Sequence, residues 1–219
     1  MTVLVTGFEP YGGHAVNPSE RLARSLDGAV VAGAQVEARQ LAVDLRTIGP
    51  SVRAAIEETE PRLVVGLGLW PGEPMLRLER IAVNQADFEV PDNAGLVACA
   101  PLVQDGPAAR PSTLPLHAIS ESLLAAGIPC RLSGTAGLYL CNAMLYHALE
   151  ACAARRPAPL AGFIHVPYLP EQVADLARTT RARHGLGLGQ RADLASMSLD
   201  VMHAGVCLAI QTALEAATV

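Results

Sequence analysis

Aromatic residues, charged residues and closely spaced cysteines are all scarce in this sequence of 219 residues. Charged side chains make up only 17% of it, and no run of Lys and Arg alternates with aromatic residues. We therefore expect no nucleic-acid partner. No uninterrupted apolar run reaches the roughly 18–20 residues that a membrane-spanning helix needs, so we expect no membrane association either.

The cysteines form no CxxC pair and are odd in number, lying at positions 99, 130, 141, 152 and 207. Such a set is unlike a disulfide scaffold and favours a reduced protein. The first seven residues contain no basic segment and no small-residue cleavage site, and they are typical of a strand rather than of a signal peptide. These features predict a cytoplasmic protein.

Apolar residues, by contrast, make up 51% of the chain, which is enough for a buried core. Neither an internal repeat nor a long linker divides the sequence, so we expect one domain spanning residues 1–219. Strand-like and helix-like segments alternate, which predicts an α/β fold. The expected strands are 3–7, 36–43, 63–68, 76–83, 130–132 and 160–166, and the expected helices are one from Asn17, then 52–60, 141–154 and 199–217.

Local patterns refine this scheme at three places. Asn17 can cap a helix whose Glu20 stands where a capping-box acid belongs. In segment 76–83 the apolar alternation slips at Glu79 and Arg80, which predicts a bulge or bend there. Residues 91–115 carry five prolines and are expected to form an exposed excursion.

Cys141 follows a glycine-rich turn and stands in the first turn of the expected helix 141–154. Free N–H groups and the helix dipole favour an anion there, so we expect a lowered thiol pKa and a reactive thiolate. The same N–H groups could stabilise an oxyanion. The alternative is that Cys141 is a small buried apolar residue.

His165 lies near the end of a buried strand, where open α/β sheets build active sites. On its own, a histidine in an apolar strand is more often a core residue. A distant cysteine and histidine nevertheless match the pattern of a thiol nucleophile and its base. Glu79 could orient the imidazole as the third member of a triad, or it could form a surface pair with Arg80.

Other candidate sites are weaker. His203 and Cys207 are spaced to bind a metal on one helix, but two ligands alone favour a packing role. The glycine-rich segment 185–189 lacks a preceding strand and a phosphate-binding lysine, and it is more typical of a flexible connection than of a nucleotide loop. Ser112 and Ser133 lack the GxSxG pattern of a nucleophile elbow.

Four segments together resemble pyroglutamyl peptidase type I, also called pyrrolidone carboxyl peptidase. They stand in family order and cover the chain from its start to about residue 172. The matching segments are Val5-Thr6-Gly7-Phe8-Glu9-Pro10-Tyr11-Gly12-Gly13 with Asn17-Pro18-Ser19, Glu79-Arg80-Ile81-Ala82-Val83-Asn84 with Pro91-Asp92-Asn93, Thr135-Ala136-Gly137-x-Tyr139-x-Cys141-Asn142, and Phe163-Ile164-His165-Val166-Pro167-Tyr168-Leu169-Pro170-Glu171-Gln172.

The resemblance implies an open three-layer α/β/α sandwich with a mixed, mostly parallel central sheet. It also implies an intracellular homo-oligomer, a dimer or tetramer, that needs no metal and no organic cofactor. Its catalytic residues would be Cys141, His165 and Glu79, acting through a thioester acyl-enzyme on peptides with an N-terminal pyroglutamate. The implied substrate-binding residues are Phe8, Tyr11, Asn17, Val90 and Tyr139.

This sequence departs from the commonest family pattern in the loop after residue 68. Leu69 replaces a glutamine linked with holding the lactam, and Glu73 replaces a basic residue. Two alternatives to a pyroglutamyl peptidase stay open, and the altered loop supports only the first of them. One is a Cys-His-Glu amidase for another lactam or small acyl amide, and the other is a catalytically silent relative that binds peptides.

Overall fold

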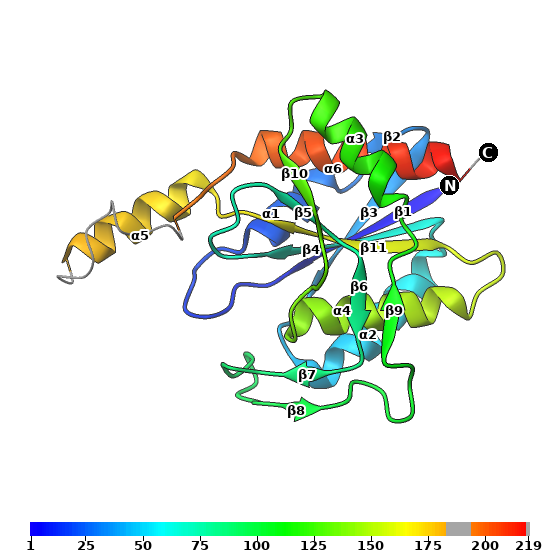
Figure 1. The fold of residues 1–219 in the computed structure, drawn as a ribbon, viewed down its shortest axis with the longest axis horizontal. Helices are drawn as coiled ribbons and strands as arrows, with labels where there is room; N and C mark the ends of the chain where they lie inside the picture. The colour runs from blue at the N-terminus through cyan, green and yellow to red at the C-terminus, as the bar shows by residue number, and fades with distance from the viewer. Residues whose placement is uncertain (183–193, 218–219) are drawn as a thin grey trace.

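A computed structural model describes residues 1–182 and 194–217. At its centre is a seven-stranded sheet, shown in Figure 1. From edge to edge the strands are β10 (Cys130–Ser133), β5 (Leu76–Glu79), β11 (Leu160–Val166), β4 (Leu63–Leu69), β1 (Thr2–Phe8), β3 (Ala34–Leu41) and β2 (Val30–Val31). Only β5 against β11 and β2 against β3 pair antiparallel, so the sheet is mixed and mostly parallel, as predicted.

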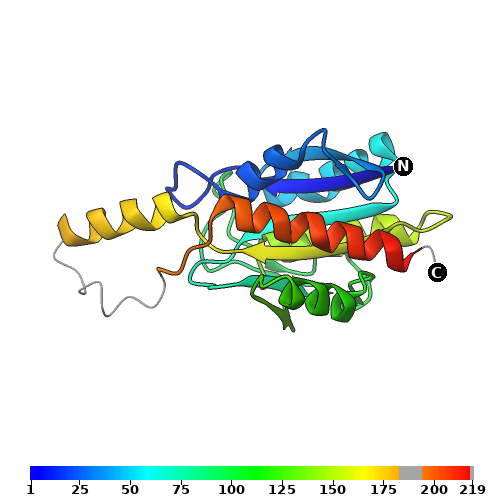
Figure 2. The same ribbon diagram turned by 90° about the horizontal axis from the view of Figure 1, so that it is seen from above.

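Helices cover both faces of the sheet and complete the expected three layers (Figures 1 and 2). Each face has its own apolar core, because side chains alternate between the faces along each strand. In β1, for example, Val3 and Val5 join one core and Leu4 joins the other. One layer holds α1 (Pro18–Leu26), α3 (Leu116–Ala125) and α6 (Leu199–Ala216), and the other holds α2 (Leu45–Thr59) and α4 (Leu140–Ala153).

The predicted strand 76–83 is two strands that belong to different sheets. After β5 the chain leaves the central sheet, and β6 (Ile81–Val83) pairs with β9 (Ala109–Pro111). The slip in apolar alternation at Glu79 and Arg80 marks this departure. A second small sheet pairs β7 (Ala86–Asp87) with β8 (Cys99–Ala100).

The start of the excursion 91–115 is anchored to the rest of the molecule by hydrogen bonds. Buried Asp92 accepts them from the N–H groups of Leu45, Ala94 and Leu96 at 3.0, 3.0 and 2.8 Å. The Asn93 side chain donates one to Glu9 Oε1 at 2.8 Å. These bonds hold the start of the excursion beside the loop that follows β1.

Asn17 caps α1 as predicted, since its side chain accepts a hydrogen bond from Ser19 N–H at 3.1 Å. The helix α5 (Pro170–Ala182), which we did not predict, projects from the body in Figure 2. Segment 185–189, expected to be a flexible connection, lies outside the described residues. Across residues 1–182 and 194–217, none of the helices combines the length and apolarity needed to cross a bilayer.

Candidate active site

Cys141 is the second residue of α4 and lies in its first turn, two residues after the N-cap residue Tyr139. The Tyr139 side chain makes no capping hydrogen bond, so it leaves the N–H groups of the first turn uncapped. Helix α4 packs closely on β4 because Gly68 has no side chain. A Cβ atom built at Gly68 would lie only 2.7 Å from the Cys141 sulfur.

His165 and Glu79 form a buried pair on the same face of the sheet as Cys141. The His165 Nδ1 atom lies 2.8 Å from Glu79 Oε1, and both side chains are almost fully buried. In the antiparallel pairing of β5 and β11, Glu79 stands opposite Phe163, two residues before His165. The carboxylate thus accepts the Nδ1 proton, and Nε2 is left as the nitrogen that can accept another.

Arg77 joins this pair from the same strand as Glu79. Its Nε–H group donates to Glu79 Oε1 at 2.8 Å and to Ser133 Oγ at 2.9 Å. Its guanidinium carbon lies 3.5 Å from the centroid of the Trp70 ring, and that ring meets the His165 ring edge-on at 4.9 Å. Oε1 of Glu79 therefore receives two donors, whereas Oε2 is buried and has no hydrogen-bond partner among the described residues.

Burial sets the protonation of the two reactive side chains. Burial, followed by the negative charge of Glu79, raises the pKa of the Cys141 thiol to about 12, although a backbone hydrogen bond lowers it. The predicted lowering of this pKa is thus wrong for the resting site, because desolvation of the thiolate outweighs the N–H groups of the helix. Burial also lowers the pKa of His165 below its ordinary value, despite the opposing effect of Glu79. Both side chains are neutral near pH 7.

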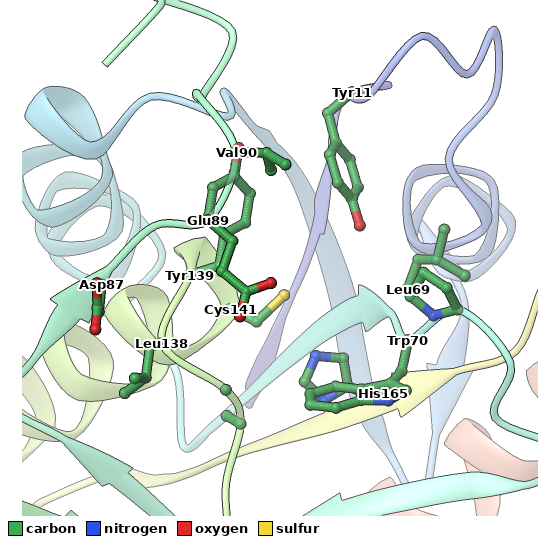
Figure 3. Close-up of a pocket in the computed structure, with 13 residues that line it drawn as sticks. Tyr11, Leu69, Trp70, Asp87, Glu89, Val90, Leu138, Tyr139, Cys141 and His165 are labelled. Atoms are coloured by element: carbon green, nitrogen blue, oxygen red, sulfur yellow. The ribbon is translucent and has the colours of Figure 1, made fainter. Parts of the chain in front are cut away.

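A cavity of about 530 Å³ opens over these two residues. Figure 3 shows the Cys141 sulfur pointing into it, with His165 and Trp70 below and Tyr11 above. Three of the five predicted substrate-binding residues line it, namely Tyr11, Tyr139 and Val90. The remaining lining residues are mostly apolar but include two acids: Leu69, Trp70, Pro71, Asp87, Glu89, Ala136, Gly137 and Leu138.

Burial raises the pKa of the Tyr11 phenol above its ordinary value. Burial also raises the pKa of the Tyr139 phenol, to about 12. The two rings lie 6.0 Å apart, and the Tyr139 hydroxyl donates to the carbonyl of Pro91 at 3.1 Å. Both phenols are therefore neutral at physiological pH and offer the cavity an apolar face with a polar tip.

Two predicted substrate-binding residues lie outside the cavity lining. Phe8 is buried in the core beneath α2 and α4. Asn17 caps α1 and donates to the Glu9 carbonyl at 3.0 Å, so it contacts the loop that carries Tyr11. Of the two residues said above to depart from the family pattern, Leu69 lines the cavity and Glu73 does not.

Sequence reasoning missed Trp70, Arg77 and the role of Glu73. A signal existed for two of them. Trp70 is the one tryptophan of an aromatic-poor chain and follows a buried strand, and Arg77 interrupts the apolar strand 76–78 on the same face as Glu79. Glu73 is itself buried and forms an ion pair with Arg131, which the sequence pattern does not indicate.

The described residues hold no cluster of three or more His, Cys, Asp or Glu side chains that could bind a metal ion. His203 and Cys207 lie on α6, in the opposite layer from Cys141, and the His203 Nε2 atom is buried.

An α/β fold that sets a helix-borne cysteine over a buried histidine–carboxylate pair has the nucleophile, base and orienting group of a cysteine peptidase. A sequence profile of the pyroglutamyl peptidase family matches residues 1–216. The chain belongs to this family.

Named relatives agree over nearly the whole chain. The pyrrolidone-carboxylate peptidase of Pyrococcus furiosus is 41% identical over 216 residues, which cover 98% of this chain and 99% of the relative. The pyrrolidone-carboxylate peptidase of Pseudomonas fluorescens is 40% identical over an alignment that covers 98% of this chain and 95% of the relative. A solved structure of a mutant pyrrolidone carboxyl peptidase from Pyrococcus furiosus superimposes with a TM-score of 0.90 at 40% identity, covering 99% of this chain and 100% of that one.

Proposed function

We propose that this protein hydrolyses the amide bond that joins an N-terminal pyroglutamate to the next residue of a peptide. Cys141 is the proposed nucleophile, His165 the acid and base, and Glu79 the carboxylate that orients the imidazole. The observation that carries the proposal is that Cys141 and His165 line one cavity while Glu79 engages the far side of the imidazole. The family and the similar proteins are named as peptidases that act on pyroglutamyl, or pyrrolidone-carboxylate, groups.

The first half of the reaction follows from the protonation of the site. Because the thiol is protonated and the imidazole neutral, Nε2 of His165 accepts the thiol proton as the sulfur attacks the pyroglutamyl carbonyl. Glu79 stabilises the imidazolium that forms. The N–H groups at the start of α4 are placed to stabilise the oxyanion, since no side chain caps them.

The second half releases both products. His165 gives its proton to the leaving amine, the carbon–nitrogen bond breaks, and the pyroglutamyl group remains on Cys141 as a thioester. His165 then takes a proton from water, which attacks the thioester. The carbon–sulfur bond breaks, the sulfur recovers its proton from His165, and pyroglutamate leaves.

The cavity suits a flat, uncharged lactam ring. Tyr11, Trp70 and Val90 supply apolar walls, as Figure 3 shows. An N-terminal glutamate in the same position would have to lose the hydration of its ammonium and carboxylate groups, which is costly without paired partners. We therefore expect pyroglutamyl amides to be cleaved and glutamyl amides to be left intact.

The test is release of a chromogenic amine from a pyroglutamyl amide under reducing conditions. The parent protein should be active, Cys141→Ser should be inactive, and Cys99→Ser should match the parent, because Cys99 is an exposed thiol on β8. An inactive parent, or a Cys141→Ser variant with parental activity, would refute the proposal. The glutamyl amide of the same amine serves as the substrate control.

We further propose that the protein is cytoplasmic and forms a homodimer or homotetramer. All five cysteines are free thiols, which suits a reducing compartment. The projecting helix α5 leaves Val173, Leu176 and Ala177 only half-buried within one chain, and a second copy would cover them. Light scattering of the purified protein gives the assembly mass, and a monomer would contradict this assignment.

A further inference from the structure

A chain of alternating charges runs from the protein surface to His165. It begins at Arg131, whose side chain is 46% exposed and donates two hydrogen bonds to Glu73, at 3.0 and 2.6 Å. Glu73 lies 3.7 Å from Arg77, and Arg77 donates to Glu79. Glu79 in turn accepts from His165, so each buried charge has an opposite charge beside it.

Strand register explains why these residues meet. Arg77 stands directly opposite Arg131 of β10 on one side and His165 of β11 on the other. On the far side of His165, its partner on the next strand, β4, is Gly68, the glycine that makes room for the Cys141 sulfur. These paired residues form one row across the sheet. The row therefore places Arg77 on the opposite side of His165 from the nucleophile.

The Arg77 side chain is held in place by hydrogen bonds and by an aromatic ring. Its Nε–H group is shared between Glu79 and Ser133, and its Nη2–H group donates to the Thr135 carbonyl at 2.8 Å. Trp70 covers the guanidinium face, and Trp70 lines the cavity whereas Arg77 does not. The tryptophan thus separates the charged group from the space that the substrate would occupy.

We propose that Arg77 is a positioning residue that holds the Glu79 carboxylate, and through it the His165 imidazole, while Trp70 shields this group from the cavity. The inference rests on the proposed function, because Arg77 acts through the proposed acid and base. It gives the unusual Glu73 a role. The common family pattern has a basic residue at position 73. Here the acid at that position forms an ion pair with Arg77 and offsets its buried positive charge.

The charge of Arg77 also opposes protonation of His165. Among the described residues, the other charged groups that act on His165 are Glu79, on the same strand as Arg77, and Glu73, in the loop before that strand. The titratable Cys141 thiol on α4 lines the same cavity as His165. Removing the arginine charge should therefore raise the pKa of His165, whereas loss of a merely structural contact should not.

The experiment compares the parent with Arg77→Gln, Arg77→Lys and the control Arg110→Gln. Arg110 makes the same kinds of contact away from the cavity, since it lies 4.9 Å from the Tyr146 ring and donates to Glu150 at 3.1 Å. The His165 imidazole is titrated by NMR without substrate, its signals assigned with a His165→Gln variant. Steady-state kinetics on a pyroglutamyl amide give kcat and KM.

We expect Arg77→Gln to raise the His165 titration midpoint and to lower kcat roughly tenfold to a hundredfold, the effect of losing one charged hydrogen bond. KM should stay within about twofold, because Arg77 does not line the cavity. Arg77→Lys should keep the parental midpoint but recover kcat only in part, since an ammonium lacks the planar fork of donors. Arg110→Gln should change neither quantity.

An unchanged His165 midpoint in Arg77→Gln, with losses that match those of Arg110→Gln, would overturn the proposal. If Arg77→Gln does not fold, Arg77→Lys decides the matter, and parental kcat in that variant would overturn the proposal equally. The titration needs no substrate. A parent without activity on pyroglutamyl amides would therefore refute the proposed function and leave this readout intact.

Discussion

Gly68 and Gly66 let the nucleophile helix approach the sheet. A Cβ atom at Gly66 would lie 2.6 Å from the sulfur of Met144 and 2.4 Å from the Phe163 ring, and one at Gly68 would meet the Cys141 sulfur. Interiors are close-packed, so even one added methyl group forces its neighbours to move. The position of the Cys141 sulfur over the sheet thus depends on two residues that have no side chain.

Gly68→Ala should impair both activity and stability. The added methyl group would push the Cys141 sulfur and the Phe163 ring, so we expect a loss of about 1–3 kcal/mol in the free energy of unfolding and a larger relative loss of kcat. Gly134→Ala is the control, because nothing lies within 4 Å of its added Cβ atom. Denaturant unfolding and steady-state kinetics measure the two effects, and parental kcat in Gly68→Ala would contradict the packing argument.

At the scale of whole elements, the sequence predicted the order of the main strands and the position of α4. Periodicity and glycine-rich turns carried that prediction, since both act locally. The sequence prediction began the helix that precedes β4 at residue 52, which is too late. The structure begins α2 at Leu45, after the cap Asp44, and includes Pro50 within the helix. Pro50 is exposed, but as the sixth residue of the helix it has no N–H group to bond the carbonyl of residue 46, so a proline at this position argued against a helix.

Helix α5 escaped prediction for a related reason. We assigned no element to this segment from the sequence, yet Pro170 is the first residue of the helix, where a missing N–H group costs little. Gln172 strengthens this start by accepting a hydrogen bond from Leu169 N–H at 3.0 Å. The family resemblance, for its part, predicted Cys141, His165 and Glu79 as a set. It did not predict Trp70 and Arg77, because both residues lie outside the segments that carry the resemblance.

Asn17 links helix α1 to the loop that carries Tyr11, and two variants separate its two roles. Asn17→Asp keeps the acceptor for Ser19 N–H but loses the bond donated to the Glu9 carbonyl. We expect it to keep most of the stability while KM rises. Asn17→Ala loses both roles and should also cost about 1 kcal/mol, as expected for a lost cap.

Thermal unfolding and KM for a pyroglutamyl amide measure these two effects. A parental KM in both variants would show that the anchored loop has no bearing on substrate binding.

At the scale of the whole molecule, stability depends on pH through buried histidines. Burial lowers the pKa of both His165 and His147 in the folded protein. Below the ordinary histidine value near 6.5, the unfolded chain binds protons that the folded protein does not bind. The contribution of these residues is therefore complete above about pH 6.5 and is lost as the pH falls toward their folded pKa values.

The free energy of unfolding should accordingly decrease between pH 7.5 and pH 5.5. Each of the two histidines contributes a slope of up to about 1.4 kcal/mol per pH unit. His147→Gln should reduce this slope, because one of the two groups no longer titrates. Urea unfolding at several pH values measures it, and a slope that is absent in the parent or unchanged in the variant would contradict the assignment.

The family, the fold and the layering were all predicted from the sequence and agree with the comparisons over nearly the full chain. The protonation of the Cys141 thiol in the resting site was not predicted, because it depends on how far the folded molecule shields the thiol from water. In the proposed mechanism, the neutral thiol gives its proton to the neutral imidazole as the sulfur attacks the substrate carbonyl. Every step of the proposed reaction then passes through one covalent species on Cys141.

Trapping that species tests the account most directly. The protein is mixed with excess pyroglutamyl amide, quenched in acid within the first turnover, and analysed by mass spectrometry of its peptides. We expect the mass of one pyroglutamyl group on the peptide that contains Cys141 and on no other cysteine peptide. Turnover of the amide with no acylated peptide under rapid quenching, or acylation of a different residue, would contradict the account.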